Sequence, residues 1–367
     1  MPLTTDDGAL GALLGAHFAG HRPAALGLAV SGGGDSMALL HLAAQWARAQ
    51  GIRVEAATVD HGLRPEAADE ARLVAGACAA LGLRHQTLGW QGWDGQGNLQ
   101  AEARAARYRL LAGWGRARGL DRILLGHTMD DQAETFLLRL ARKSGVDGLA
   151  AMRAVFDRDG QGFGRPLLAA RRRELRDYLD RRGLSWCEDP SNQDPRFDRV
   201  RMRRALEVLA PLGIDAPALA ATGGHLGAAR AALDHLARIT AHRICRIEHG
   251  DVLIDRAGLG AAPQDSRHRL LGAALIWVSG APHAPRSAAL SRLWQAIEDG
   301  QDMTLAGCLV AVTARELRVM REFNAVRELR AAAPQWDRWQ VAGPWQAGHE
   351  MRALGAEALA GIADWRA

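Results

Sequence analysis

The sequence predicts an α/β fold in which a parallel sheet carries helices on both faces, followed by a mainly helical second domain with a small β element. Three observations predict this architecture. Short apolar runs alternate with longer amphipathic segments over residues 26–142, polar residues follow the apolar runs directly, and the composition changes beyond residue 225. Such alternation favours a parallel sheet with right-handed crossovers, which binds ligands at the carboxyl ends of its strands.

The first domain, expected at residues 1–215, is organised by four strands and the helices between them. The expected strands are LGLAV (26–30), VEAATVD (54–60), the weaker HQTLGW (85–90) and RILLGH (122–127). The expected helices cover 36–48, a segment starting at Pro65, 99–118 and 131–142. Proline suits a first helical turn, and the acids Glu66, Asp69 and Glu70 that follow it complement the helix dipole.

The second half of the chain is less regular. Residues 166–183 are typical of a helix closed by Gly183, and 210–224 are expected to form a linker. The elements expected in a second domain at 225–367 are a helix at 226–247, helices near 266–279 and 286–299, and a β-hairpin at 304–322. Tryptophans in the tail either stack on nucleotides or, as we expect, fill a small β core; they are Trp336, Trp339, Trp345 and Trp365.

Composition excludes several classes of protein. With 367 residues, 48% of them hydrophobic and 24% charged, the chain is typical of a globular protein. Its relevant apolar stretch, 270–282, is shorter than the roughly 18 residues that span a bilayer. The N-terminus has no basic leader and the four cysteines form no C-x-x-C pair, so we expect a cytoplasmic protein without a zinc ribbon or redox dithiol.

The distribution of charge is more informative than its total. The net charge is +5, and Lys143 is the only lysine among the basic residues. Codon composition alone can produce an arginine excess. Residues 165–204, however, contain twelve arginines against seven acids. This segment is the best candidate for a polyanion-facing surface, although solvated helix faces look similar.

The segment Ser31–Ser36, SGGGDS, follows the first predicted strand and opens a helix. Glycines there permit positive φ, and successive N–H groups at a helix N-terminus form a nest for an anion. A phosphate loop of the common NTPase kind ends in Lys-Ser or Lys-Thr, whereas this one ends in Asp35-Ser36. Without the lysine, the nest suits a pyrophosphate leaving group, with Asp35 available for magnesium. The alternative is a plain turn in which Asp35 or Ser36 caps the helix.

S-G-G-x-D-S after the first strand resembles the signature of the PP-loop ATP pyrophosphatases. These enzymes have a Rossmann-like sheet and split ATP between its α- and β-phosphates to adenylate a substrate. Further segments resemble the tRNA(Ile)-lysidine synthetases in order and spacing, most strongly over residues 25–205. These segments are Val59–Pro65, Asn98–Tyr108, Gly126-His127 with Asp130–Thr135, Glu188–Asn192 and, more weakly, Leu305–Cys308 and Arg321-Glu322.

The resemblance implies a ligase that uses ATP and Mg²⁺ to adenylate the wobble cytidine of an isoleucine tRNA with a CAU anticodon. The ε-amine of free L-lysine then displaces AMP at C2, and the product lysidine moves charging from methionine to isoleucine. The implied ATP-binding residues are Ser31, Gly32, Gly33, Gly34, Asp35, Ser36 and His127. The implied catalytic residues are Asp35, Arg107, Asp130, Asp131 and Glu134.

The acidic segment can also be interpreted from its residues alone. Asp130 and Glu134 lie four apart on one helix face, where carboxylates could hold an ammonium or magnesium ion and accept a proton from the amine. Asp131-x-x-Glu134 also has the spacing of a capping box with Asp131 as the cap, and the two roles can coexist. His127 either polarises a phosphate oxygen or hydrogen-bonds a neighbouring carbonyl.

Two groups of residues are expected to contact substrate. Asp60 and His61 follow the second strand, although Asp60 also suits a structural cap of its loop. Arg104, Arg107 and Tyr108 either meet the nucleotide or present a basic face, and the resemblance favours Arg107 with Tyr108 as a wall of the site. The run expected to face the tRNA is Arg199, Arg201, Arg203 and Arg204. The family commonly has Arg-Asn where this chain has Arg199-Val200, which puts one polar contact in doubt.

Other interpretations stay open at this point. Another PP-loop tRNA-modifying enzyme, such as a thiolase, would generally call on cysteine pairs or an iron–sulfur cluster, and no C-x-x-C is present. A non-catalytic tRNA-binding protein on this scaffold is disfavoured by the intact loop and the acidic segment. The sequence also leaves a homodimer open.

Overall fold

The computed structural model describes residues 5–62, 67–91, 93, 98–188, 196–281, 283–346 and 348–353. The chain divides into two compact units, Met1–Ala228 and Ala229–Ala367. Each unit has its own hydrophobic core, and each is described by itself below.

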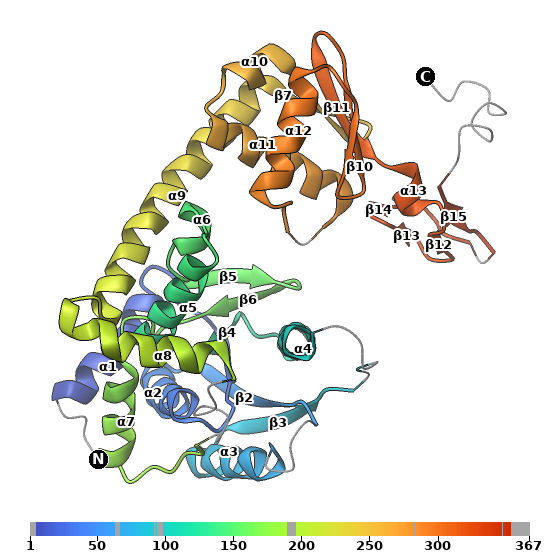
Figure 1. Cartoon of the computed structure of the whole chain (residues 1–367). Helices are drawn as coiled ribbons and strands as arrows, with labels where there is room; N and C mark the ends of the chain where they lie inside the picture. The colour runs from blue at the N-terminus through green and yellow to red at the C-terminus, as the bar shows by residue number, and fades with distance from the viewer. Residues whose placement is uncertain are drawn as a thin grey trace. The chain divides into compact units, whose positions relative to one another are not determined.

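A six-stranded sheet forms the centre of the N-terminal unit (Figure 1). Its order is β3-β2-β1-β4-β6-β5, and every neighbouring pair is parallel except the antiparallel pair β5–β6. The strands are β1 (Ala25–Ala29), β2 (Arg53–Asp60), β3 (Arg84–Gly89), β4 (Arg122–Leu125), β5 (Val155–Arg158) and β6 (Gln161–Gly164). The predicted mostly parallel α/β sheet is confirmed, with the four expected strands in their places.

Helices cover both faces of this sheet. One face carries α1 (Thr5–His17), α2 (Gly34–Gln50), α3 (Ala67–Leu81) and α7 (Arg172–Arg181), and the other carries α4 (Leu99–Ala117). Strand β1 contributes side chains to the cores on both faces of the sheet: Leu26 and Leu28 belong to the core under α1, α2, α3 and α7, and Ala25 and Ala29 belong to the core against α4. Burial on both faces is typical of a central parallel strand.

Several elements differ from expectation. The hairpin β5–β6 was not predicted, although Asp159 and Gly160 at its turn have φ of 51° and 71° and match the Asp-Gly hairpin signal. Helix α5 (Met129–Ala141) begins two residues before Asp131, because Thr128 is its N-cap. Helix α7 starts only at Arg172, and α1 was not predicted. Helix α8 (Asp198–Leu209) carries the arginine run that the resemblance placed on a helix facing the tRNA. The predicted start at Pro65 lies outside the described residues.

The expected linker at 210–224 is largely helical. It consists of the short 3-10 turn η2 (Ala210–Leu212) and the start of α9 (Ala216–Ile244). Ala216 and Leu219 pack with Ala133 and Leu137 of α5. Alanine-rich composition and this buried contact outweigh the helix-weakening pair Gly223-Gly224.

The C-terminal unit contains a five-stranded antiparallel sheet in the order β7-β8-β11-β10-β9. Helices α11 (Gln264–Ser279) and α12 (Ser287–Glu298) pack on it, and α10 (Arg256–Ala261) follows β8. The strands are β7 (Cys245–Glu248), β8 (Asp251–Asp255), β9 (Met303–Leu305), β10 (Cys308–Val312) and β11 (Glu316–Arg321). The predicted helices with a β element are confirmed, with the hairpin extended into a sheet.

The tail tryptophans do not form the small buried core that we expected. Trp336 and Trp339 pair across the short hairpin of β13 (Gln335–Trp336) and β14 (Trp339–Gln340). Trp339 is 44% exposed, and Trp336 and Trp345 are half-buried. Trp365 lies outside the described residues. The remaining short elements are α6 (Val146–Leu149), α13 (Phe323–Val326), β12 (Arg330–Ala331) and β15 (Met351–Arg352).

Within the described residues, no single helix is long and apolar enough to cross a membrane. One bent pair, Asp198–Leu212 with Ala216–Ile244, would meet the requirement in length and composition only.

Candidate active site

The phosphate loop joins β1 to α2, and no side chain of the described residues caps the N-terminus of that helix. Gly33 is the N-cap of α2 and makes no side-chain cap bond, so the alternative that Asp35 or Ser36 caps the helix is wrong. Ser36 Oγ instead stabilises the loop, donating to the carbonyl of Gly33 at 2.9 Å and accepting from the N–H of Ser31 at 3.1 Å. An uncapped helix N-terminus is suited to an anion.

Two glycines are required by this geometry. Gly32 has φ of +90°, in the region that favours glycine. Gly126, after β4, lies so close to the start of α2 that an added Cβ would be 2.9 Å from the carbonyl oxygen of Asp35. The loop therefore sits against the end of β4, which brings His127 and α5 beside it.

A distant segment closes over the loop. The N–H of Cys187 donates to the carbonyl of Gly32 at 2.9 Å, and Cys187 forms a parallel bridge with Gly33. The neighbouring Trp186 ring lies against Gly34. We call residues 184–188 the strap. It holds the loop through backbone contacts that no motif in the loop itself indicates.

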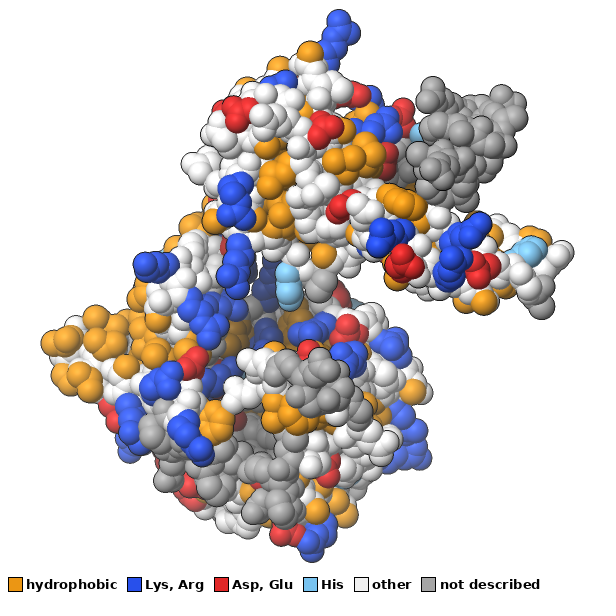
Figure 2. Space-filling view, turned by 45° about the vertical axis from the view of Figure 1, so that its right-hand side comes forward, with side chains coloured by type: hydrophobic (Ala, Val, Ile, Leu, Met, Phe, Trp, Pro, Cys, Tyr) orange, Lys and Arg blue, Asp and Glu red, His pale blue; other side chains and the backbone are white. Residues whose placement is uncertain are grey.

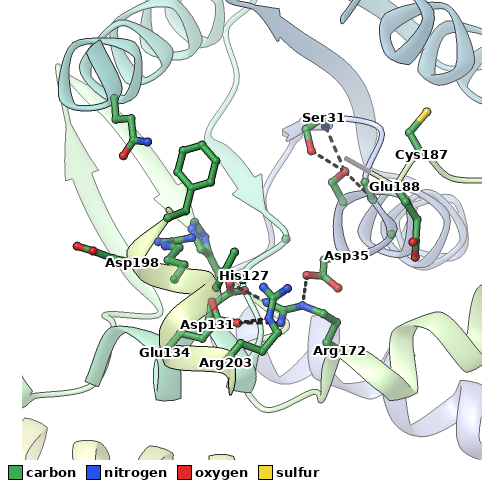
Figure 3. A pocket seen from close by; sticks show the side chains of 18 of the residues that line it. Ser31, Asp35, His127, Asp131, Glu134, Arg172, Cys187, Glu188, Asp198 and Arg203 are labelled. Carbon is green, nitrogen blue, oxygen red and sulfur yellow. Dashed lines mark hydrogen bonds and ion pairs between the residues drawn. The ribbon is translucent and has the colours of Figure 1, made fainter. Parts of the chain in front are cut away.

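A cavity of about 930 Å³ opens at the carboxyl ends of β1 and β4. The predicted site residues among its lining are Ser31, Gly33, Gly34, Asp35, Ser36, Arg107, His127, Asp131, Glu134, Arg199 and Arg203. Figure 3 shows side chains from the loop, from α5 and from the strap converging on this space. The loop and the acidic segment, far apart in sequence, thus share one cavity.

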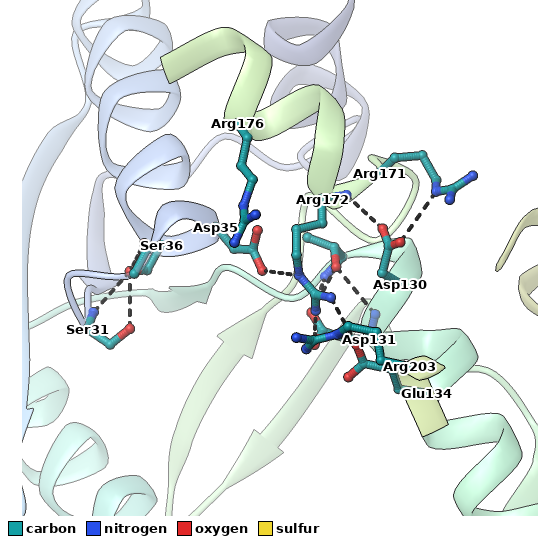
Figure 4. Close-up of polar contacts among 12 residues, drawn as sticks. Ser31, Asp35, Ser36, Asp130, Asp131, Glu134, Arg171, Arg172, Arg176 and Arg203 are labelled. Carbon is teal, nitrogen blue, oxygen red and sulfur yellow. Dashed lines mark hydrogen bonds and ion pairs between the residues drawn. The ribbon is translucent and has the colours of Figure 1, made fainter. Parts of the chain in front are cut away.

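Arg172, at the start of α7, lies at the centre of the acidic residues (Figure 4). Its Nε donates to Oδ2 of Asp35 at 3.1 Å, Nη1 to Oε1 of Glu134 at 2.9 Å, and Nη2 to Oδ1 of Asp131 at 3.1 Å. Arg203 from α8 adds a bond from Nε to the same Oε1 of Glu134 at 3.1 Å. The side chain of Glu134 is only 2% exposed, so these bonds are largely screened from solvent.

Asp131 and Asp130 have different surroundings. Asp131 occupies position N3 of a capping box, accepting from the N–H and the hydroxyl of Thr128 at 2.8 and 2.9 Å. The predicted box Asp131-x-x-Glu134 is therefore wrong: the box that opens α5 is Thr128-x-x-Asp131, with Thr128 as the cap. Asp130 accepts from the backbone N–H of Arg172 at 2.7 Å and pairs with Arg171, and it is not among the cavity-lining residues. Asp130 and Glu134 consequently do not form the paired carboxylates that their spacing suggested.

The charges of the cluster follow from burial and from Arg172. Burial raises the pKa of Asp35 from 3.8 to about 6, against the opposing effect of Arg172. Burial also acts to raise the pKa of Asp131, but Arg172, His127 and the bonds from Thr128 outweigh it, and the pKa falls. Burial would lower the pKa of Arg172, yet its three carboxylates raise it. Asp35 is left with a buried Oδ1 that has no hydrogen-bond partner among the described residues.

His127 and Arg107 form the wall on the other side. Burial lowers the pKa of His127 to about 3, with Asp131 opposing and Arg165 and Arg107 assisting, so the imidazole is neutral at pH 7. Its buried Nδ1 has no hydrogen-bond partner in the part of the chain that the structure describes, so this nitrogen does not make the carbonyl contact of the structural alternative. Arg107 lines both this cavity and an adjoining one of about 170 Å³, which His61 also lines.

Four predicted substrate residues lie elsewhere. Tyr108 is buried in the core, with edge-on contacts to the stacked rings of Phe156 and Phe163, so it is not a wall of the cavity. Arg104 is exposed, with its guanidinium over the Tyr108 ring. Asp60 accepts from the N–H of Gly62 at 2.8 Å, which is the structural cap considered for it. Arg201 is exposed and pairs with Asp198 on its own helix.

Sequence reasoning missed the arginines that surround the cavity. Arg142, Arg172, Arg176 and Arg196 line it beside the predicted arginines. The arginine excess at 165–204 pointed toward the last three, and no sequence signal pointed toward Arg142. Arg176 pairs with Glu188 of the strap at 3.3 Å. The space-filling view shows basic side chains gathered on the N-terminal unit (Figure 2). A group of residues that could chelate a metal by itself, with three or more His, Cys, Asp or Glu side chains, is not found among the described residues.

Comparison with known proteins agrees with this arrangement. Residues 11–209 match the family model ATP_bind_3, a PP-loop domain. The chain is 46% identical over 357 residues to a tRNA(Ile)-lysidine synthase of Ruegeria pomeroyi, covering 96% of this chain and 85% of that protein. It is 40% identical over 311 residues to the tRNA(Ile)-lysidine synthase of Rhodopseudomonas palustris, covering 81% and 90%.

Among solved structures, the U34-tRNA thiolase NcsA from Methanococcus maripaludis, with its 4Fe-4S cluster, is similar with a TM-score of 0.52. Identity is 15%, and the match covers 60% of this chain and 79% of that one, so the likeness shows the fold alone. Because the PP-loop domain matches over residues 11–209 and the relatives match over most of their length, this chain belongs to the tRNA(Ile)-lysidine synthase family.

Proposed function

We propose that the protein ligates free L-lysine to C2 of the wobble cytidine of an isoleucine tRNA with a CAU anticodon. ATP adenylates the cytidine with release of pyrophosphate, and the ε-amine of lysine then displaces AMP. The observation that carries this proposal is the shared cavity, in which the uncapped phosphate loop faces an acidic cluster. The names of the relatives support the same pair of substrates.

The phosphate loop is proposed to bind the β- and γ-phosphates as the departing unit. Its N–H groups and the helix dipole stabilise the negative charge that develops on pyrophosphate. The smaller cavity adjoins the loop at Ser31 and is lined by residues of β1 and β2 with His61 and Arg107. It is proposed to receive the adenosine part of ATP.

Asp35 fits a magnesium ion that would accompany the nucleotide. Its Oδ1 is buried and has no partner in the described parts of the chain, and Asp35 lines the cavity. Magnesium favours one or two carboxylates together with phosphates and waters. Such an ion would neutralise charge on the phosphates during adenylation. The lack of a complete chelating group around Asp35 in the described residues agrees with phosphates supplying the other ligands.

The acidic cluster is proposed to bind the lysine amine. Asp131 and Glu134 supply buried carboxylates, and the amine has to lose a proton as it attacks the cytidine. We assign the main contribution in this step to Glu134. His127, neutral at pH 7, acts there as a hydrogen-bonding group and not as a cation.

The tRNA is proposed to approach over α8 and the arginines around the cavity. Arg199 is exposed and lines the cavity, which suits a phosphate contact, whereas Arg203 reaches inward to Glu134. A cytoplasmic location follows from this substrate. A homodimer stays a prediction, which light scattering at micromolar concentration tests.

Incubation with ATP, labelled lysine and total tRNA tests the function directly. The expected result is label in a single nucleoside of one isoleucine tRNA, identified as lysidine after nuclease digestion. Pyrophosphate exchange is measured beside it, with and without tRNA. A protein that releases pyrophosphate but leaves the tRNA unlabelled would be another PP-loop modifying enzyme, and one that does neither would contradict both enzymatic assignments.

A further inference from the structure

Arg172 joins the nucleotide side of the cavity to its acidic side. One nitrogen contacts Asp35, which belongs to the phosphate loop, and two others contact Asp131 and Glu134 on α5. These are three different nitrogens of one planar group, so the distances between the three carboxylates are set by the rigid shape of a guanidinium. Among the described residues, no hydrogen bond or ion pair joins Asp35 directly to α5, and Arg172 of α7 bridges the two.

The backbone of Arg172 is fixed as firmly as its side chain. Its N–H donates to Asp130 at 2.7 Å, which ties the first turn of α7 to the first turn of α5. The side chain is 17% exposed. Arg172 is therefore anchored at both ends within one cluster, and it lies between the place where adenylation occurs and the place proposed for the lysine amine.

We propose that Arg172 is a positioning residue that holds the amine-binding carboxylates in register with the nucleotide, so that lysine captures the adenylated cytidine before water does. This inference rests on the proposed function. In the productive step, the lysine nitrogen bonds to C2, AMP departs with the former O2, and the amine proton passes to a carboxylate or to solvent. When water attacks C2 instead, its oxygen restores the cytidine carbonyl and AMP departs, so the net reaction is ATP and water to AMP and pyrophosphate.

The number of AMP molecules formed for each lysidine measures this capture. It is determined in single-turnover reactions with isoleucine tRNA, ATP and lysine, for the wild type and three variants. Arg172→Met removes the charge and all three hydrogen bonds to the carboxylates. Arg172→Lys keeps the charge, but its single amine nitrogen cannot occupy the positions of the three guanidinium nitrogens. Arg173→Met is the matched control, because the neighbouring Arg173 side chain is 91% exposed and, within the described ranges, pairs only with Asp177 of its own helix.

We expect Arg172→Met to raise the ratio of AMP to lysidine about tenfold or more, since displacement by about 1 Å can cost roughly 100-fold in a positioned reaction. The KM for lysine is expected to rise more than the KM for ATP. Arg172→Lys should give an intermediate ratio, and Arg173→Met the ratio of the wild type.

Equal loss of AMP and lysidine in Arg172→Met, with the ratio unchanged, would assign Arg172 a merely structural role and overturn the inference. If that variant does not fold, Arg172→Lys decides, and a wild-type ratio in it overturns the inference equally. Absence of lysidine with the wild-type protein is a different result. It would refute the proposed function itself.

Discussion

Replacing Asp35 by asparagine tests whether the site is built at the expense of stability. Burial raises the pKa of this carboxyl from 3.8 to about 6, so the folded protein retains a proton that the unfolded chain has lost. The stability that this proton confers is complete below pH 3.8 and is lost as the pH rises through about 6. At about 1.4 kcal/mol per pKa unit, the ionised carboxylate destabilises the N-terminal unit by about 3 kcal/mol at pH 8 and by about half of that at pH 5.

Asp35→Asn removes the charge while keeping the shape, and it is therefore expected to stabilise the nucleotide-free protein by up to about 3 kcal/mol at pH 8. The gain should be about half as large at pH 5. Urea unfolding followed by tryptophan fluorescence and far-UV circular dichroism, at both pH values and with EDTA present, measures it. Adenylation should be lost in the same variant. A variant that is no more stable than the wild type at pH 8 would refute the conclusion that Arg172 compensates the buried charge of Asp35 only in part.

Three further predictions concern the loop, the acidic cluster and the tRNA surface. Gly126→Ala is expected to destabilise the protein by about 1–3 kcal/mol and to raise the KM for ATP, because the new Cβ would meet a carbonyl at the start of α2. Gly113→Ala is the control, because Gly113 of α4 has open space around it and alanine there should stabilise the protein by about 0.5–1 kcal/mol. Thermal unfolding compares the two variants. Glu134→Gln is expected to weaken lysine use while pyrophosphate exchange persists, and an unchanged KM for lysine would contradict that role. Arg199→Ala should reduce the slope of log affinity for tRNA against log salt by about one, as filter binding measures, and an unchanged slope would place the phosphate contact elsewhere.

The sequence predicted those parts of the fold that local patterns encode. The four central strands are short apolar runs, and the helices between them follow from amphipathic spacing. The hairpin at Asp159-Gly160 was missed although its turn signal is present, because its flanking strands are short and lack alternation. The start of α9 was missed because proline and glycine residues at 210–224 are typical of a linker. Burial of Leu219 against α5 nevertheless stabilises a helix there.

Only those parts of the candidate site that lie in short sequence motifs could be predicted. Ser31–Ser36 and the acidic segment could be found in the sequence, and the structure places both at one cavity. Arg172 could not be found, since it lies 137 residues beyond Asp35 and its role depends on where α7 is packed. The resemblance drew Tyr108 into the site, but its position on α4 turns the ring into the core. The type of a residue shows which chemistry its side chain can perform, and the packing of its helix or strand decides whether that side chain faces the cavity.

The strap sets the shortest N-terminal fragment that can form the complete phosphate loop. A fragment ending after β6 would contain the whole glycine loop, the strands beside it and α5, yet it would lack Cys187, whose N–H meets the carbonyl of Gly32. During synthesis, the nucleotide half of the cavity therefore cannot assume its final form until the chain has been extended through residue 188 and α7 has docked. Contacts that span about 150 residues also slow folding, because a long loop has to close before they form. Attempts to reduce the enzyme to an ATP-binding core should accordingly retain residues 184–188, even though nothing in them resembles a nucleotide-binding motif.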